Sequence, residues 1–167
     1  MTASTIIETL VEPVLMYLNG GHAPERPSSL EALTTIRGSS GLIHRVECMH
    51  DDGNKDLYVC VTLGVYYLDS PPTKKIQEVL YSMDECFPER LFFYSGQQGF
   101  GWRPSVSYTL METDSLSFND VNSLVSGLVC ALDTTSMFFE LLARGVFPKK
   151  EEIALAGMDP YNQKFKL

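Results

Sequence analysis

The sequence of 167 residues has no basic run. The adjacent lysines Lys149-Lys150 are followed directly by two glutamates, and the sequence has 13 Lys and Arg against 21 Asp and Glu. The formal net charge is −8 and the sequence pI is about 4.8. An acidic chain of this kind is repelled by nucleic acids and by anionic membranes, so we expect neither as its main partner.

Long apolar runs are also missing. No stretch reaches the roughly 18 consecutive apolar residues of a membrane span. Residues 1–21 are rich in apolar side chains, but they lack a basic start and contain Glu8, Glu12 and Pro13. We therefore interpret them as an amphipathic helix rather than a targeting segment, and we expect a cytoplasmic protein.

Paired cysteines are absent as well. Cys48, Cys60, Cys86 and Cys130 are irregularly spaced, and no CxxC motif is present. In a chain that carries no export signal, such cysteines are expected to be reduced and to act as small, buried, apolar residues. We therefore expect no disulfide framework.

The clearest pattern that is present lies within residues 41–69 and predicts a β-hairpin. Residues 51–55, with the sequence DDGNK, have the composition of its turn. After this turn, apolar side chains occupy every second position, which places them on one face of an extended strand. These residues are Leu57, Val59, Val61, Leu63, Val65 and Tyr67.

Helical spacing of apolar residues predicts three helices around this hairpin. The first covers residues 4–19 and contains Pro13, which should kink or split it. The second begins at residues 70–72 and is stopped by Pro88; the third runs from Ser117 to Gly145. A short helix over 149–156 is expected in the tail.

Three further short strands complete the prediction, at residues 33–37, 91–95 and 106–110. The order of elements is then α-β-β-β-α-β-β-α. We predict an α+β fold with one twisted antiparallel sheet of about five strands and flanking helices. The length fits a single domain over 1–167, with a Pro/Gly-rich loop at 20–32 and a C-terminal tail at 146–167.

The strongest candidate for a metal site is formed by His44, Cys48 and His50, with Cys60 on the next strand. If the hairpin pairs Cys48 with Tyr58, all four share one face of the sheet. Zinc binds such ligands. Positions six residues apart on a strand are about 20 Å apart, however, which is too far for one tetrahedral ion. We therefore predict no metal site and no cofactor.

Other candidates for chemistry are weaker. Cys86 stands beside Asp84 and Glu85, whose charges would raise the pKa of its thiol and oppose activation. The glycine-rich loop 96–101 leads into a strand and not into a helix N-terminus, so it lacks the geometry of a phosphate loop. Acidic residues in the turn 51–56 do not have the spacing of an EF-hand. We predict no catalytic residues and no enzymatic activity.

The order of elements and the second half of the chain resemble two related families, over roughly residues 41–144. These are the class I type III secretion chaperones and the YbjN-like proteins, which are regarded as regulators of sensory transduction. The resemblance is carried by the apolar spacing of the second helix, by the strands LFFYS and SVSYTLME, and by the final helix with its acidic connector, TDSLSFNDVNSLVSGLVCALDTTSMFFELLA. The helix positions are Ile76, Val79, Leu80 and Met83.

The resemblance implies a cytosolic homodimer that holds an extended segment of a cargo protein against apolar grooves. Two alternatives stay open: a YbjN-like regulator that binds another partner, and a small enzyme of unrecognised type. By analogy, cargo contacts would fall on the first helix and first three strands, and dimer contacts on the second helix and later strands. The implied cargo contacts are Leu33, Ile36, Ile43 and Val46, and the implied dimer contacts are Val79, Met83 and Phe93.

Overall fold

The computed structural model describes residues 6–86, 90–96 and 101–155. Its elements follow the predicted order, with a helical turn at 150–155 after them. In chain order they are η1 (Ile7–Val11), α2 (Glu12–Leu18), β1 (Glu31–Arg37), β2 (Ile43–Asp51), β3 (Asp56–Leu63), α3 (Lys74–Cys86), β4 (Arg90–Ser95), β5 (Trp102–Leu110), η2 (Thr113–Ser115) and α4 (Phe118–Ala143).

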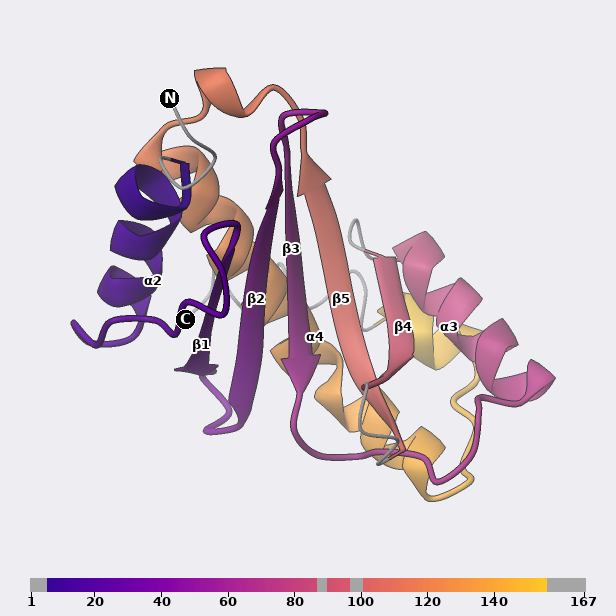
Figure 1. Ribbon diagram of the computed structural model, residues 1–167. Helices are drawn as coiled ribbons and strands as arrows, with labels where there is room; N and C mark the ends of the chain where they lie inside the picture. The colour runs from indigo at the N-terminus through magenta and orange to yellow at the C-terminus, as the bar shows by residue number, and fades with distance from the viewer. Residues whose placement is uncertain (1–5, 87–89, 97–100, 156–167) are drawn as a thin grey trace.

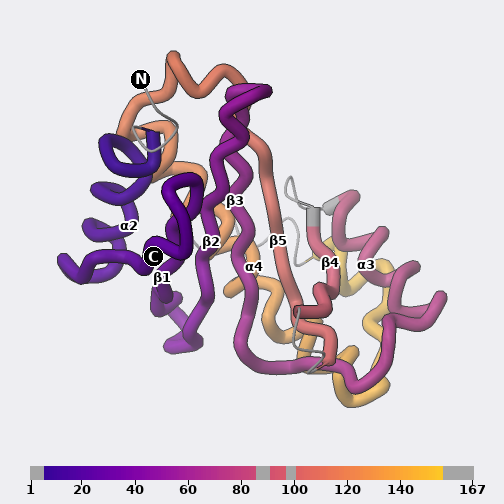
Figure 2. The backbone as a smooth tube through the Cα atoms, in the orientation of Figure 1, coloured from indigo at the N-terminus to yellow at the C-terminus, as the bar shows by residue number. Residues whose placement is uncertain are grey.

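The five strands form one antiparallel sheet in the order β1-β2-β3-β5-β4, which confirms the predicted fold class. Figure 1 shows α4 crossing diagonally behind the sheet, with α2 beside it near β1 and α3 beside β4. The tube in Figure 2 shows the same arrangement, with the front of the central strands free of helices. The sheet therefore has an inner face toward α4 and an outer face that no described helix covers.

The core lies between the inner face and α4. Leu57, Val59 and Val61 of β3 are fully buried there. On the helix side, the ring of Phe139 packs edge-to-face against Phe93 of β4, with 5.3 Å between the ring centroids. Burying one such side chain contributes roughly 1.5–3 kcal/mol, so this layer supplies most of the stability of the fold.

Helix α4 is also the one helix, among the described residues, that is long and apolar enough to cross a membrane by length and composition alone. In the fold, the apolar residues of α4 form part of the hydrophobic core. Val125, Leu128 and Leu132 are completely buried against the inner face of the sheet and α2. The hydropathy of α4 is accounted for by its place in the core.

The first helix is split next to its proline, as the sequence predicts. Residues Ile7–Val11 form a π-helix, and Pro13 then lies in the first turn of α2. Pro13 has no N–H to donate to the preceding turn, and a wider π turn tolerates the missing bond. Both helical segments pack against α4 and β1 of their own chain. Residues 4 and 5 of the predicted helix lie outside the described residues.

The strand after the hairpin turn is shorter than its alternation of apolar residues predicts. β3 ends at Leu63, and Tyr66 has a positive φ of 58°, which breaks the extended conformation. Val65 and Tyr67 are consequently exposed, at 39% and 52%. The alternation predicted the buried positions up to Leu63, and beyond this residue the chain leaves the sheet to reach α3.

A capping box begins α4, and its removal should have a measurable cost. The Ser117 hydroxyl accepts the Asp120 backbone N–H, and the Asp120 carboxylate accepts the Ser117 N–H at 2.8 Å. These bonds also lower the pKa of Asp120. We expect Ser117→Ala to destabilise the protein by about 1 kcal/mol in chemical denaturation. Ser126→Ala, at an exposed position of the same helix, is the control and should not destabilise; equal effects would contradict this role of the cap.

Candidate functional site

No described helix covers the outer face of the sheet, and its central rows expose apolar side chains. Met49 of β2 and Tyr58 of β3 are direct cross-strand partners, exposed to 48% and 38%. Further along the strands, Ile43 is 42% exposed, and Tyr94 on β4 is 42% exposed. Exposed apolar groups on an otherwise regular sheet are typical of a binding surface.

Between these side chains, the floor of the outer face is built from small residues. Thr62 of β3 pairs with Ser105 of β5, and the Ser105 hydroxyl donates to Thr62 Oγ1 at 3.0 Å. Cys60 pairs with Ser107 in the next row. Burial raises the pKa of Cys60 and that of the neighbouring Tyr58. This part of the outer face therefore carries small, neutral polar groups next to the larger side chains of Met49 and Tyr58.

Two of the four predicted cargo contacts lie on this face. Ile43 is exposed and Leu33 is partly exposed on it, whereas Ile36 is 8% exposed and Val46 is fully buried on the inner face. In a strand, residues three apart point to opposite faces. Ile36 and Val46 therefore belong to the core, and the outward positions of the same strands that could meet a partner are Thr35 and Arg45.

The predicted dimer contacts also lie inside the monomer. Val79 and Met83 of α3 are 9% and 0% exposed, and Phe93 of β4 is 5% exposed in contact with Phe139. Their side chains pack into the chain's own core and offer no surface to a second copy in this conformation. On the same two elements, Tyr81 is 68% exposed and Tyr94 is 42% exposed.

A second cluster, which sequence reasoning missed, joins the turn between β1 and β2 to the middle of α4. The Asp133 carboxylate accepts His44 Nε2 at 2.8 Å, the Ser39 hydroxyl at 3.1 Å and the Ser40 N–H at 3.0 Å, together with the Ser40 hydroxyl. Burial alone would raise the pKa of Asp133, but the hydrogen bonds from Ser40 and His44 outweigh it and lower that pKa.

The geometry of this cluster is structural rather than that of a nucleophile with its base. Both serine hydroxyls donate to Asp133, and neither donates to His44, so the histidine does not activate a serine. Gly38 completes the contact, because a Cβ there would lie 2.7 Å from His44 Nε2 and closer still to the Asp133 carboxylate. In the sequence, the only sign of this cluster was Asp133, an acidic residue among the apolar residues of α4.

The register of the hairpin removes the metal candidate. Cys48 pairs with Val59 and not with Tyr58, so Cys60 points to the outer face while His44, Cys48 and His50 point inward. His50 Nε2 lies 3.3 Å from the Thr113 hydroxyl. Within the described ranges, no group of three or more His, Cys, Asp or Glu side chains is arranged to hold a metal ion.

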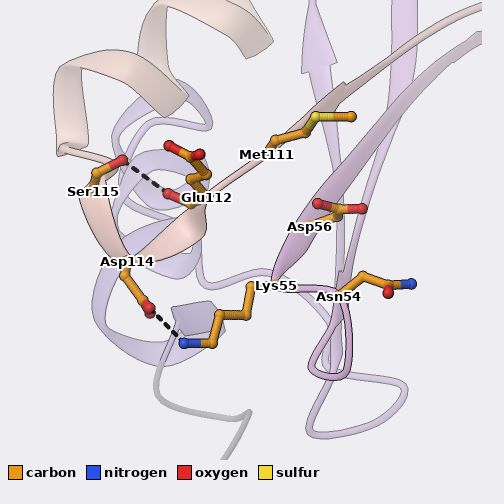
Figure 3. A pocket seen from close by; sticks show the side chains of 7 residues that line it. All are labelled: Asn54, Lys55, Asp56, Met111, Glu112, Asp114 and Ser115. Atoms are coloured by element: carbon orange, nitrogen blue, oxygen red, sulfur yellow. Dashed lines mark hydrogen bonds and ion pairs between the residues drawn. The ribbon is translucent and has the colours of Figure 1, made fainter.

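An open pocket of about 470 Å³ lies where the β2–β3 turn meets the connection into α4 (Figure 3). Two of its four charged side chains, Lys55 and Asp114, pair with each other. Lys55 Nζ donates to Asp114 Oδ2 at 2.8 Å, which raises the pKa of Lys55, and the Ser115 hydroxyl donates to the Glu112 carbonyl. The Asp51 carboxylate binds Asn54 as in an ordinary turn. This pocket contains no pair of side chains arranged as nucleophile and base.

Thiol chemistry offers a check of these placements. Burial, with Glu47 nearby, raises the pKa of Cys48 to about 12, whereas Cys130 is only partly buried. We expect iodoacetamide at neutral pH to label Cys130 before Cys48 in the native protein, because the reactive form is an accessible thiolate. Peptide mass mapping over time measures the order; denatured protein is the control, in which the two should react at similar rates. Faster native labelling of Cys48 would contradict its placement.

Two other candidates from the sequence, the side chain of Cys86 and residues 97–100 of the glycine-rich loop, lie outside the described part of the structure.

The chain is thus an α+β protein with helices on one side of its sheet and an outer face that no described helix covers. No protein-family model matches the sequence, and no curated protein gives a significant match. Among solved structures, a chain in the crystal structure of the ExsC–ExsE complex is similar to it, with a TM-score of 0.48 and 14% identity, over 79% of this chain and 92% of that chain. The function proposed below rests on the fold and surface of this chain itself.

Proposed function

We propose that this chain is a non-enzymatic, protein-binding module of the secretion-chaperone kind, which holds an extended segment of another protein on the outer face of its sheet. The observation that carries the proposal is the exposed cross-strand pair of Met49 and Tyr58 on the outer face, which no described part of the chain covers. A surface with exposed apolar side chains in regular rows suits an extended segment, whose own side chains alternate with the same period.

The edge strand β1, which the preceding loop covers only in part, supports the same kind of partner. At β1, the backbone N–H and C=O of Leu33 are paired with Glu25 of the preceding loop, at 2.8 and 2.7 Å. An open pocket of about 330 Å³ begins beside this contact and is bordered by Thr35 and Arg45. The loop already adds one bridge to the edge, and an extended partner could add more in the same way.

The absence of enzymatic activity is part of the proposal. It is supported by the role of the buried His44–Asp133 pair, because these two side chains fasten a turn to α4 and are inaccessible to a substrate. We also propose a cytoplasmic homodimer. The exposed Tyr81 on α3 is the group that would contribute to a dimer surface at that end of the sheet.

A photo-crosslinker at defined positions tests the proposed function. Benzoyl-phenylalanine replaces Tyr58 on the outer face in one variant and Tyr17, an exposed tyrosine of α2, in the control. Both are expressed in cells that naturally contain the protein and irradiated before lysis. We expect position 58 to yield one or a few crosslinked proteins, each joined through one contiguous segment. Equal products from both positions, or none from position 58, would overturn the proposal; native mass measurement separates dimer from monomer.

A further inference from the structure

We propose that the segment bound on the outer face carries carboxylates, which pair with three arginines at one end of that face. This inference rests on the proposed function, because it names the charge of the partner at the same surface. The side chains of Arg37, Arg45 and Arg103 project from β1, β2 and β5, and all three are exposed. The name "arginine end" is used below for these three residues.

The strand register places the three arginines together. Arg37 pairs with Ile43, and Arg103 pairs with Tyr94. When the strand register is continued across β3, these two pairs fall in a single row of the sheet. Arg45 stands in the next row of the same face. At about 4.8 Å between neighbouring strands, the row from β1 to β5 spans about 14 Å. Gly64 follows β3 in the middle of this row, and its missing side chain leaves the floor low between Ile43 and Arg103.

The charges at this end are incompletely neutralised by the chain. Arg45 Nε pairs with Glu47 Oε1 at 2.9 Å, and both side chains are exposed. Arg37 donates to the Gly41 carbonyl, which carries no charge. Within the described residues, neither Arg37 nor Arg103 has an ion pair. In a chain with 21 acidic and 13 basic residues, a local excess of positive charge on a binding face indicates an acidic partner.

The opposite end of the same strands has the opposite charge. Asp51 and Asp56 close the β2–β3 hairpin, and hydrogen bonds from Asn54 lower the pKa of Asp51. Along β2, eight residue steps of about 3.3 Å separate Ile43 from Asp51, about 26 Å in all. This exceeds the Debye length of about 8 Å at physiological salt. Carboxylates of the partner are therefore favoured at the arginine end and repelled at the hairpin end, which fixes the direction of the bound segment.

A peptide suits this end better than another polyanion. The arginines are interleaved with Ile43, Phe92 and Tyr94, which are suited to apolar side chains of a peptide. A nucleic acid would also have to approach a chain of net charge −8 and would be repelled over most of its length. The occupant is thus an extended peptide with alternating apolar residues and a cluster of Asp or Glu toward one terminus.

Two matched peptides test this inference on the full chain. Both are fluorescein-labelled 12-mers of alternating Val and Thr; in one, the last three Thr positions are Glu, and in the other they are Gln. We expect the Glu peptide to bind about tenfold more tightly at 50 mM salt, which corresponds to about 1.4 kcal/mol. The advantage should shrink at 200 mM salt and vanish in an Arg45→Gln/Arg103→Gln variant. Arg144→Gln, an exposed arginine after α4, is the matched control and should keep it.

Each remaining outcome overturns the inference. Equal binding of the two peptides, binding of neither, an advantage that persists in the double variant, or tighter binding of a dT12 oligonucleotide would each contradict it. Equal and measurable binding of both peptides would leave the proposed function in place, because it removes only the preference for charge. Failure of the crosslinking experiment would instead remove the proposed function.

Discussion

Replacing Asp133 with alanine is expected to lower the free energy of unfolding by about 3–5 kcal/mol, the range found when one partner of a buried pair is removed. Asp133 accepts hydrogen bonds from His44, Ser39 and Ser40, and His44 is completely buried. Without the carboxylate, His44 Nε2 loses its only partner, while His44 Nδ1 already has none among the described residues. Urea denaturation followed by circular dichroism measures the loss.

The same carboxylate predicts a dependence on pH. The pKa of Asp133 is lowered in the folded protein, so its contribution to stability is fully present above the unfolded pKa of about 3.9 and is lost as pH falls through the folded value. The difference in stability between the wild type and Asp133→Asn should therefore be constant near pH 6 and shrink below about pH 4. A difference that stays constant down to pH 2, or a loss under 1 kcal/mol for the alanine variant, would contradict the role given to the cluster.

Placing charges on the outer face of the sheet is expected to abolish partner binding. In the double variant Met49→Glu/Tyr58→Glu, two adjacent apolar contacts are lost and two carboxylates must be desolvated under the bound segment. Central interface residues contribute about 2 kcal/mol or more each, so we expect the affinity for the crosslinked segment to fall at least about 100-fold. Fluorescence anisotropy with that segment as a labelled synthetic peptide gives the affinity.

Because Met49 and Tyr58 are 48% and 38% exposed, the double variant should fold with little change in stability. The matched control is Met137→Glu/Tyr17→Glu, which places the same charges at exposed positions of α4 and α2. Binding to this control should stay within about twofold of the wild type. An equal loss in both variants would indicate a general effect of added negative charge rather than contact at the outer face.

The alternation of residues in β3 and the helical spacing in α4 were sufficient to predict the order of elements and the sheet. These patterns report which face of an element is buried, and each was strong between Leu57 and Leu63 and between Val121 and Leu142. Pro13 likewise predicted the division of the first helix, since the missing N–H has a local effect.

The candidate site was harder to predict because it depends on how elements meet. Ile36 and Val46 are apolar and lie on the right strands, but the strand period of two turns them inward. The pairing of Cys48 with Val59 was set by the length of the turn, which composition alone does not define. Asp133 contacts residues some ninety positions earlier in the chain, and no local pattern encodes such a contact.

Methyl NMR of the full chain with the crosslinked segment tests the central claim most directly, because the protein carries methyl groups on and off the proposed surface. Ile43 and Met49 lie on the outer face, whereas Met137 lies on α4 and is 55% exposed. We predict that titration of the segment shifts the methyl signals of Ile43 and Met49 and leaves that of Met137 in place. A shift of Met137, with Ile43 and Met49 unmoved, would contradict binding on the open face of the sheet.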